Sequence, residues 1–250
     1  MSTIKRHEQI LEILITEKEA TVSRLSEELG VSGKTIREDL EKLEKKGLLR
    51  RFHGGAALAN EGFAGLFPDS LPNSKNEDAK AQAARRGLEL VNTGEVIALD
   101  GGSTTLAMAK LLDNIPITVV TNDLFIIGEL VKKDKVRLVV PGGYRNRNQL
   151  INENFASIIS NMNIQKAFIS ATGIHEEYGL TVFTQAIVGQ KRAIMQAAAE
   201  CYCVADHTKF NQCALLTFAK PEELTAIVTD PGLPGETVQR YTARGIQLIR

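Results

Sequence analysis

Apolar residues recur at helical spacing through the first 45 residues and then form short continuous runs along the rest of the chain. Three early stretches, each with charged residues between the apolar ones, predict amphipathic helices. The first ends near Glu17, the second covers about 22–29, and the third follows Ser32 and stops before Gly47. Their inward faces are Ile4, Ile10, Leu11, Leu14 and Ile15; then Val22, Leu25 and Leu29; then Ile36, Leu40 and Leu43.

The junction between the second and third helices has the residues of a helix-turn-helix. Gly30 supplies the positive φ that the end of a helix commonly needs, and the Ser32 hydroxyl suits the N-cap of the next helix. In this motif the N-terminal part of the second helix enters the major groove of DNA. The residues expected to face DNA from this helix are Ser32, Gly33, Lys34, Thr35, Arg37 and Glu38.

A short hairpin is predicted directly after the third helix. Residues 48–52 form the first strand, 53–55 a tight turn and 56–58 the returning strand, which is the arrangement of a wing. The hairpin would place Arg50, Arg51 and His53 against phosphates. The net charge of the chain is zero, but DNA meets only one surface of a protein. That surface has a local excess of basic residues, namely Lys42, Lys45, Lys46, Arg50 and Arg51 against the single Glu44.

The stretch 21–56 resembles the N-terminal domain of the DeoR family of bacterial transcriptional repressors. The shared residues are Val31-Ser32, Thr35-Ile36-Arg37, Asp39-Leu40, Leu43-Glu44, Gly47, Arg51 and 53–56. Two residues depart from the pattern, since Glu38 stands where many members have arginine and Gly33 opens the helix. The resemblance implies that double-stranded operator DNA is a partner. A surface segment with solvated charges and a protein-binding scaffold are the alternatives.

Proline, glycine, asparagine and serine concentrate between residues 59 and 76. Such a composition rarely forms a regular element, so this segment is expected to be a linker. It divides the chain into a winged helix-turn-helix domain, about 1–58, and a larger domain, about 77–250.

In the larger domain, continuous apolar runs alternate with helical stretches. The expected helices lie around 103–112, 123–133, 184–199 and 235–244. This alternation predicts an α/β fold with a mainly parallel sheet that is covered on both faces. The expected strands are 96–100, 117–121, 136–141, 166–171, 201–206 and 226–230.

Polar and glycine-rich segments follow several of these strands. Ligands of parallel sheets bind beyond the carboxyl ends of the strands, where glycines and a helix N-terminus can hold an anion. A phosphate-bearing small ligand is therefore expected at this edge. The segments are neither a Walker A loop nor a dinucleotide loop, and each taken alone is also compatible with a plain turn. The residues expected to bind the ligand are Asp100, Gly101, Gly102, Ser103, Thr104, Thr105, Thr121, Asn122, Gly142, Gly143 and Lys209.

The segments 100–104, 121–122, 141–143 and 206–210 resemble the DeoR-type sensor domain. The resemblance implies a fold similar to ribose-5-phosphate isomerase and CoA-transferase domains, and phosphorylated sugars or sugar alcohols as effectors. Two departures concern the ligand. Gln185 stands in the segment where many members have a glutamate, and 67–71 lacks the arginine that the family often has there.

An enzyme is the rival class, with Asp100 or Asp206 as the general base of a sugar-phosphate isomerase. An attached DNA-reading domain favours the regulator, which needs no catalytic residue and no cofactor. Cys201, Cys203, Cys213 and His207 suggest zinc, but the spacing is unusual for a zinc site, and no metal is expected.

Composition is that of a soluble globular protein, with 43% hydrophobic and 24% charged residues. No apolar run reaches the length of a membrane span, the N-terminus has no secretory pattern, and the odd cysteine number suits a reducing compartment. The sequence therefore predicts a cytoplasmic repressor of a sugar-utilisation operon. Operator symmetry implies at least a homodimer, and the family makes a homotetramer an alternative.

Overall fold

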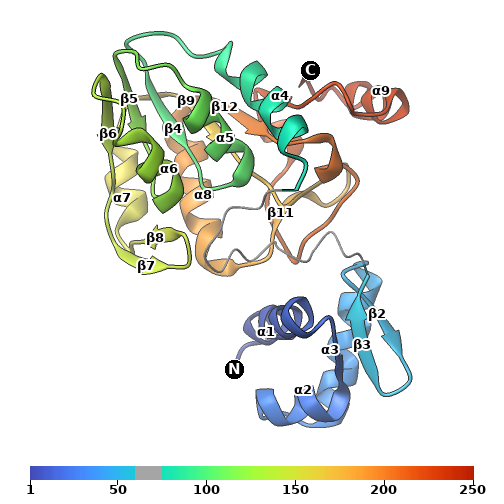
Figure 1. The fold of residues 1–250 in the computed structure, drawn as a ribbon. Helices are drawn as coiled ribbons and strands as arrows, with labels where there is room; N and C mark the ends of the chain where they lie inside the picture. The colour runs from blue at the N-terminus through green and yellow to red at the C-terminus, as the bar shows by residue number, and fades with distance from the viewer. Residues whose placement is uncertain (60–74) are drawn as a thin grey trace.

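A computed structural model of the protein describes residues 1–59 and 75–250, with the N-terminal domain below the larger one in Figure 1. The N-terminal domain contains helices α1 (Thr3–Glu17), α2 (Val22–Leu29) and α3 (Gly33–Lys45), which confirms the three predicted helices. Gly30 has φ 63°, and Ser32 Oγ accepts a hydrogen bond from the Thr35 amide at 3.2 Å. Ile4 is 46% exposed rather than facing inward; it lies in the first turn of α1, ahead of His7, the first buried residue of the helix.

The predicted wing is present and belongs to a three-stranded sheet. Strands β2 (Leu49–Phe52) and β3 (Gly55–Leu58) form the antiparallel hairpin, and β1 (Glu19–Thr21) pairs with the other edge of β3. Strand β1 was not predicted, because three residues with one buried side chain are too short to show alternation.

The larger domain is built on a seven-stranded sheet in which all neighbouring strands are parallel. Its order is β15-β14-β12-β9-β4-β5-β6. All six predicted strands are confirmed, whereas β15 has only two residues and shows no pattern in the sequence. The bounds are β4 (Val96–Leu99), β5 (Ile117–Val120), β6 (Val136–Val139), β9 (Ile164–Ile169), β12 (Ala198–Val204), β14 (Ala226–Val228) and β15 (Leu248–Ile249).

Helices cover both faces of this sheet, as predicted (Figure 1). One face packs on α4 (Glu77–Leu88), α5 (Ser103–Leu111) and α6 (Leu124–Leu130), and the other on α7 (Phe155–Ser160), α8 (Gln185–Ala197) and α9 (Gly235–Ala243). Two single-turn 3₁₀ segments, η2 (His207–Lys209) and η3 (Pro221–Glu223), follow β12 and β13. Helix α4 was not predicted, because its buried face consists of Lys80, Ala83, Ala84 and Gly87 rather than large apolar residues.

Two smaller elements stand beyond the carboxyl ends of the parallel strands. One is the antiparallel sheet of β10 (Gly173–His175), β11 (Gly179–Val182) and β13 (Leu216–Ala219). The other is the hairpin of β7 (Tyr144–Asn146) and β8 (Gln149–Ile151), which follows β6. Neither was predicted from the sequence. Within 1–59 and 75–250, no helix is long and apolar enough to cross a membrane.

The two domains are in direct contact. Phe183, Ala214 and Leu215 of the larger domain belong to the same buried apolar cluster as the core of the winged helix. Glu8 Oε1 accepts a hydrogen bond from the Gln185 amide at 2.6 Å, and Lys46 Nζ lies 3.5 Å from a main-chain oxygen of the larger domain. Helix α2 lies at the end of the winged helix farther from this contact (Figure 1).

Candidate nucleic-acid interface and ligand cavity

The residues expected to meet DNA lie on the surface of α3 and the wing. All are exposed apart from Gly33 and Thr35, which are half-buried. The exposed ones are Ser32, Lys34, Arg37, Glu38, Arg50, Arg51 and His53. The structure thus brings α3 and the tip of the wing to solvent on the same domain.

A buried carboxylate fixes the position of α3 against α1. Asp39, which is 1% exposed, accepts hydrogen bonds from Arg6 Nε at 2.5 Å and His7 Nε2 at 2.9 Å. Burial disfavours the charged carboxylate, but these two partners outweigh burial and hold the pKa of Asp39 below its ordinary value. Burial is also the main cause that lowers the pKa of His7. The orientation of the DNA-reading helix therefore depends on a charge network inside the domain.

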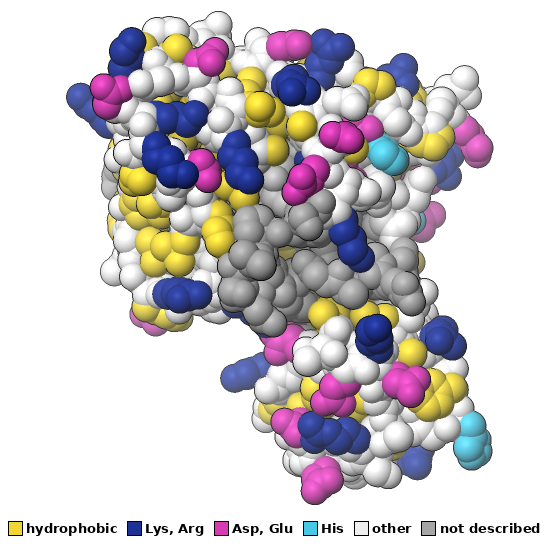
Figure 2. Space-filling view, viewed as in Figure 1, with side chains coloured by type: hydrophobic (Ala, Val, Ile, Leu, Met, Phe, Trp, Pro, Cys, Tyr) yellow, Lys and Arg dark blue, Asp and Glu magenta, His cyan; other side chains and the backbone are white. Residues whose placement is uncertain are grey.

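Several of the basic residues are already paired with acidic neighbours. Arg51 Nε lies 2.7 Å from Glu44 Oε2, and Lys45 Nζ lies 2.8 Å from Glu41 Oε1. Arg37 makes no ion pair with any residue in the described parts of the chain. Figure 2 shows basic and acidic side chains mixed over the visible face of both domains, in keeping with a net charge of zero.

A cavity of about 170 Å³ opens beyond the carboxyl ends of the parallel strands. Its walls come from the start of α5, the β7–β8 hairpin, the segment after β9 and the start of α8. The described residues that line it include Gly101, Gly102, Ser103, Thr104, Asp123, Phe125, Asn146, Arg147, Asn148, Gln149, Ser170, Thr172, Phe183, Thr184, Ala186, Lys191 and Lys209.

The N-terminus of α5 faces this cavity without a side-chain cap. Gly102 occupies the N-cap position, and the amides of 103–105 have no hydrogen-bond acceptor among residues 1–59 and 75–250. Free amides at a helix N-terminus favour an anion. A Cβ on Gly102 would lie 2.4 Å from Ser170 Cβ, so a side chain at this position would displace the neighbouring strand end. The close packing requires glycine here.

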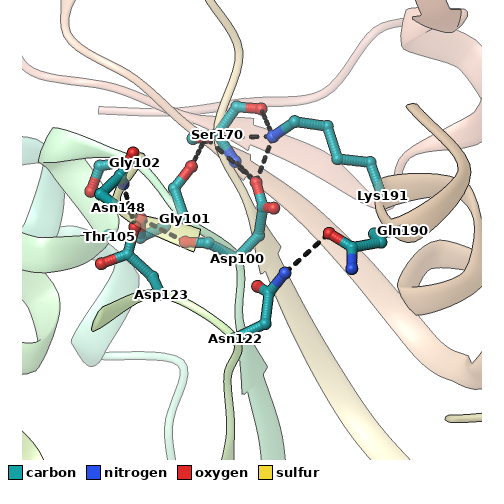
Figure 3. A network of polar contacts seen from close by, with 10 residues as sticks. All are labelled: Asp100, Gly101, Gly102, Thr105, Asn122, Asp123, Asn148, Ser170, Gln190 and Lys191. Atoms are coloured by element: carbon teal, nitrogen blue, oxygen red, sulfur yellow. Dashed lines mark hydrogen bonds and ion pairs between the residues drawn. The ribbon is translucent and has the colours of Figure 1, made fainter. Parts of the chain in front are cut away.

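Asp100, at the end of β4, is part of a buried ion pair rather than of the cavity wall (Figure 3). Its Oδ2 accepts from Lys191 Nζ and from the Ser170 amide and hydroxyl, the last two at 2.9 and 3.0 Å. Lys191 Nζ also donates to the Ser170 carbonyl oxygen at 2.8 Å. This network ties α8 to the ends of β4 and β9, and it occupies the ammonium group of Lys191.

Asp123 is a buried carboxylate in the cavity wall that the sequence reasoning missed. Its Oδ1 accepts from the amides of Phe125 and Ile126, and its Oδ2 accepts from Asn148 Nδ2 at 2.5 Å. Burial raises the pKa of Asp123 to about 6, although these hydrogen bonds oppose the shift and only the charge of Asp100 adds to it. Asp123 thus gains or loses its charge about two pH units above an ordinary aspartate, near pH 6.

The structure does not bring all the predicted ligand residues to the cavity. Gly101–Thr104 and Lys209 line it. The Thr105 hydroxyl donates to the Asp100 carbonyl oxygen at 2.6 Å, and Thr121 Oγ1 accepts from the Asp123 amide. Asn122 Nδ2 donates to Gln190 Oε1 at 2.8 Å (Figure 3).

The two glycines after β6 also lie away from the cavity wall. Gly142 and Gly143 have φ values of 79° and 129°. A Cβ on Gly143 would lie 2.2 Å from the Ile151 carbonyl oxygen. These glycines therefore turn the chain from β6 into the β7–β8 hairpin, and that hairpin supplies lining residues in their place.

Most of the missed lining residues come from segments that are distant in the sequence. Asn146–Gln149, Ser170, Phe183, Thr184 and Lys191 meet only because the chain folds back across the sheet edge. Asp123 had a local signal, because it follows the strand-end pair 121–122 directly. Gln185 does not line the cavity among the described residues; its amide contacts Glu8, as noted above. The segment 67–71 lies outside the described residues.

The cysteine and histidine group noted in the sequence is dispersed. Cys201 and Cys203 both pack in the apolar core on one face of β12, where burial raises the pKa of the Cys201 thiol to about 12. His207 Nδ1 lies 2.7 Å from Asp230 Oδ2. The described ranges contain no group of three or more His, Cys, Asp or Glu side chains placed to hold a metal ion.

Comparison with known proteins matches both domains to family models. Residues 75–231 match the DeoR C terminal sensor domain, and residues 6–61 match the DeoR-like helix-turn-helix domain. The L-fucose operon activator of Haemophilus influenzae is 33% identical over 241 residues, covering 94% of this chain and 95% of its own. The glycerol-3-phosphate regulon repressor of Escherichia coli is 30% identical, covering 99% of each chain.

Among solved structures, ribose 5-phosphate isomerase A from Methanocaldococcus jannaschii aligns with a TM-score of 0.42 and 20% identity, covering 54% of this chain and 55% of its own. The sorbitol operon regulator SorC of Klebsiella pneumoniae aligns with a TM-score of 0.35 and 14% identity, covering 82% and 89%. At these scores the likeness does not extend to function.

A winged helix joined to a cavity-bearing α/β domain defines a class of DNA-binding regulators that carry a sensor domain. Both family models match, and relatives of at least 30% identity span nearly the whole chain. The chain belongs to the DeoR family of transcriptional regulators, and the predicted family and fold class are confirmed.

Proposed function

We propose that this chain represses a carbohydrate-utilisation operon and leaves its operator when a phosphorylated sugar or sugar alcohol enters the cavity. The observation that carries the proposal is the shared wall between cavity and winged helix. Phe183 lines the cavity and packs into the apolar cluster of the DNA-reading domain. A ligand that moves this wall therefore acts directly on that domain. The names of two full-length relatives, a glycerol-3-phosphate regulon repressor and an L-fucose operon activator, support a carbohydrate effector.

DNA is read in this proposal by the N-terminal part of α3 in the major groove, with the wing on the flanking phosphates. Arg37, exposed and without an ion pair within the described residues, has its guanidinium available for a base edge or a phosphate. The assigned contacts are Ser32, Gly33, Lys34, Thr35, Arg37, Glu38, Arg50, Arg51 and His53.

The phosphate of the effector is assigned to the start of α5. The uncapped amides there, the hydroxyls of Ser103 and Thr104, and the ammonium of Lys209 supply donors and positive charge. A supporting role in the cavity framework is assigned to Asp100, Thr105, Thr121, Asn122, Gly142 and Gly143, whose contacts hold the strand ends in place.

The proposal contains no catalytic step. Asp100 and Asp206, the two candidate bases, do not line the cavity among the described residues, and each is at most 3% exposed. Failure of the purified protein to convert ribose 5-phosphate is the expected result, and turnover would restore the isomerase alternative.

We further propose that the protein acts in the cytoplasm as at least a homodimer, because operators with two-fold symmetry bind symmetric pairs. Light scattering on the full-length protein gives its oligomeric state.

The proposal is tested by fluorescence anisotropy of the full-length protein on labelled DNA from upstream of its own gene, at fixed salt. Matched pairs of compounds, such as glycerol and glycerol 3-phosphate or fructose and fructose 6-phosphate, are added at equal concentration. Release by a phosphorylated member and not by its unphosphorylated partner is expected. Specific DNA binding that no phosphorylated compound releases would contradict the assigned effector class.

Two variants locate the effector within the cavity. Ser103→Ala and Lys209→Ala should leave operator affinity unchanged and weaken release by the active compound. Lys132→Ala serves as the control, because Lys132 is an exposed lysine paired with Glu129 at 3.1 Å on the surface. If the active compound releases DNA from both cavity variants as it does from the wild type, the phosphate does not bind at the start of α5.

A further inference from the structure

We propose that Arg147 binds the phosphate group of the effector. To do so, its guanidinium leaves Glu12 of the winged helix and pairs with the phosphate instead. This inference rests on the proposed function, since it concerns the same cavity. Arg147 would then transmit the effect of an anion in the cavity to the DNA-reading domain.

Arg147 contacts both domains. It lies at the tip of the β7–β8 hairpin, lines the cavity together with the start of α5, and forms an ion pair with Glu12 of α1. The guanidinium of Arg147 already binds a carboxylate of the winged helix. A phosphate in the cavity would offer it a second anionic partner.

The other two cations of the wall are placed differently. Lys191 is 1% exposed, and its ammonium donates to Asp100 and to both oxygens of Ser170, so its three protons have acceptors. Lys209 follows β12, on one side of β4 in the sheet order, whereas Arg147 follows β6 on the other side. Because α5 begins directly after β4, Lys209 and Arg147 approach its N-terminus from opposite sides.

The backbone at Arg147 shows that its position is imposed on the chain. Its φ is +56°, a left-handed conformation that costs a residue with a side chain more than it costs glycine or asparagine. The hairpin has asparagine on both sides, at 146 and 148, yet arginine occupies the strained position. The Arg147 carbonyl oxygen accepts a hydrogen bond from Arg145 Nε at 2.9 Å, which helps to hold the turn.

The exchange has an electrostatic consequence for α1. Glu8 and Glu12 lie one turn apart on the side of α1 that meets the larger domain, and Glu8 is held by the Gln185 amide. Burial is the main cause that raises the pKa of Glu8, and the charge of Glu12 adds to it. The charges of Lys5 and Arg147 act against this rise. When a phosphate draws Arg147 away, the two carboxylates face an anion and Lys5 is the cation that remains beside Glu8. Repulsion then favours separation of α1 from the cavity wall.

The test measures effector binding and operator binding separately on full-length variants. Binding of inorganic phosphate, glycerol 3-phosphate and fructose 6-phosphate is measured by isothermal titration, and operator binding by anisotropy, for the wild type, Arg147→Gln, Arg147→Lys and Glu12→Gln. Arg86→Gln is the matched control, because Arg86 is an exposed arginine paired with a glutamate, Glu89, at 3.1 Å on α4. Far-UV circular dichroism checks that each variant folds.

Arg147→Gln should lower the affinity for the tightest-binding phosphorylated probe by about tenfold or more, because it removes a charge-assisted hydrogen bond. Arg147→Lys should lie between it and the wild type, because lysine keeps the charge without the planar fork. Glu12→Gln should raise the affinity for the same probe by about two- to fivefold, because Arg147 no longer has to leave a carboxylate before it binds the phosphate. Arg86→Gln should bind as the wild type does.

Two results would overturn the exchange alone, while leaving the proposed function intact. These are equal probe affinity of the wild type and Arg147→Gln, and weaker probe binding by Glu12→Gln. If no phosphorylated probe binds the wild type, the proposed function itself fails, and the exchange fails with it.

Discussion

The buried pair of Asp100 and Lys191 gives a stability prediction whose size follows from its contacts. Asp100→Asn keeps the shape of the side chain but removes the charge that faces Lys191 Nζ. Lys191 then remains a buried cation whose other acceptors, within residues 1–59 and 75–250, are the neutral oxygens of Ser170. Removing one member of a buried pair typically costs about 3–5 kcal/mol. For a domain of this size each kcal/mol lowers the melting temperature by about 2–4 °C, so a fall of about 6–20 °C is expected.

The chain contains no tryptophan, so thermal unfolding is followed by calorimetry or by circular dichroism at 222 nm. Asp113→Asn is the matched control, because Asp113 is exposed and should change the free energy of unfolding by less than about 0.5 kcal/mol. The double variant Asp100→Asn with Lys191→Met removes both buried charges and should recover most of the lost stability.

Two results would refute this reasoning. The first is a melting temperature of Asp100→Asn within about 2 °C of the wild type, since each kcal/mol is expected to move it by at least that much. The second is a double variant less stable than Asp100→Asn, which would mean that Lys191 is not destabilising once its partner is neutral. Either result would make Lys191, which lines the cavity, a candidate for direct ligand binding.

Three further predictions concern the winged helix. Arg37→Ala should weaken operator binding by about fivefold or more in anisotropy, and unchanged affinity would remove Arg37 from the interface. Arg51→Ala should reduce the slope of log affinity against log salt by about 1, and an unaltered slope would show that Arg51 stays with Glu44 on DNA. Burial lowers the pKa of His7 from 6.5, and its partners hold the pKa of Asp39 below 3.8. Both groups therefore bind more protons in the unfolded state, so their contribution to stability should fall as the pH drops below about 6.5, and again below about 3.8. The raised pKa values of Glu8 and Asp123 act in the opposite direction, so the contribution of Asp39 is measured as the difference in urea-unfolding free energy between the wild type and Asp39→Asn. A difference that does not shrink below about pH 3.8 would contradict the network.

The elements that were predicted correctly have a hydrophobic pattern that is visible in their own sequence. The strands β4, β5, β9 and β12 are continuous apolar runs, and the helices of the winged helix repeat large apolar residues at helical spacing. The β7–β8 hairpin has no such signal, because β7 is exposed along its whole length. Its conformation is set by contacts with α6, for example the hydrogen bond from Asn148 to Asp123.

Lining residues of the cavity could be predicted only where they directly follow strands of the parallel sheet. Parallel strands end at one edge, so the glycines after β4 and the lysine after β12 could be placed there from the sequence. Gly142 and Gly143 follow the edge strand β6, and there the chain leaves the sheet as a hairpin that brings Arg147 to the cavity instead. Lys191 reaches Asp100 from a helix 91 residues away, a contact that no local pattern contains.

The contacts between the domains also limit how much each can contribute to release from DNA. The Arg147 and Glu12 side chains are 30% and 38% exposed, and a pair of this exposure contributes about 1 kcal/mol at most. One such loss changes affinity about fivefold, and two losses in a dimer about 30-fold. Coupling free energies in allosteric proteins extend to about 3 kcal/mol, so the ion pair alone supplies only part of that range. The larger share is then expected from Phe183, which is 4% exposed and joins the cavity wall to the core of the winged helix. In this arrangement Arg147 responds to the charge of a ligand and Phe183 to its bulk, so a bare phosphate ion should release DNA less completely than a sugar phosphate of equal occupancy.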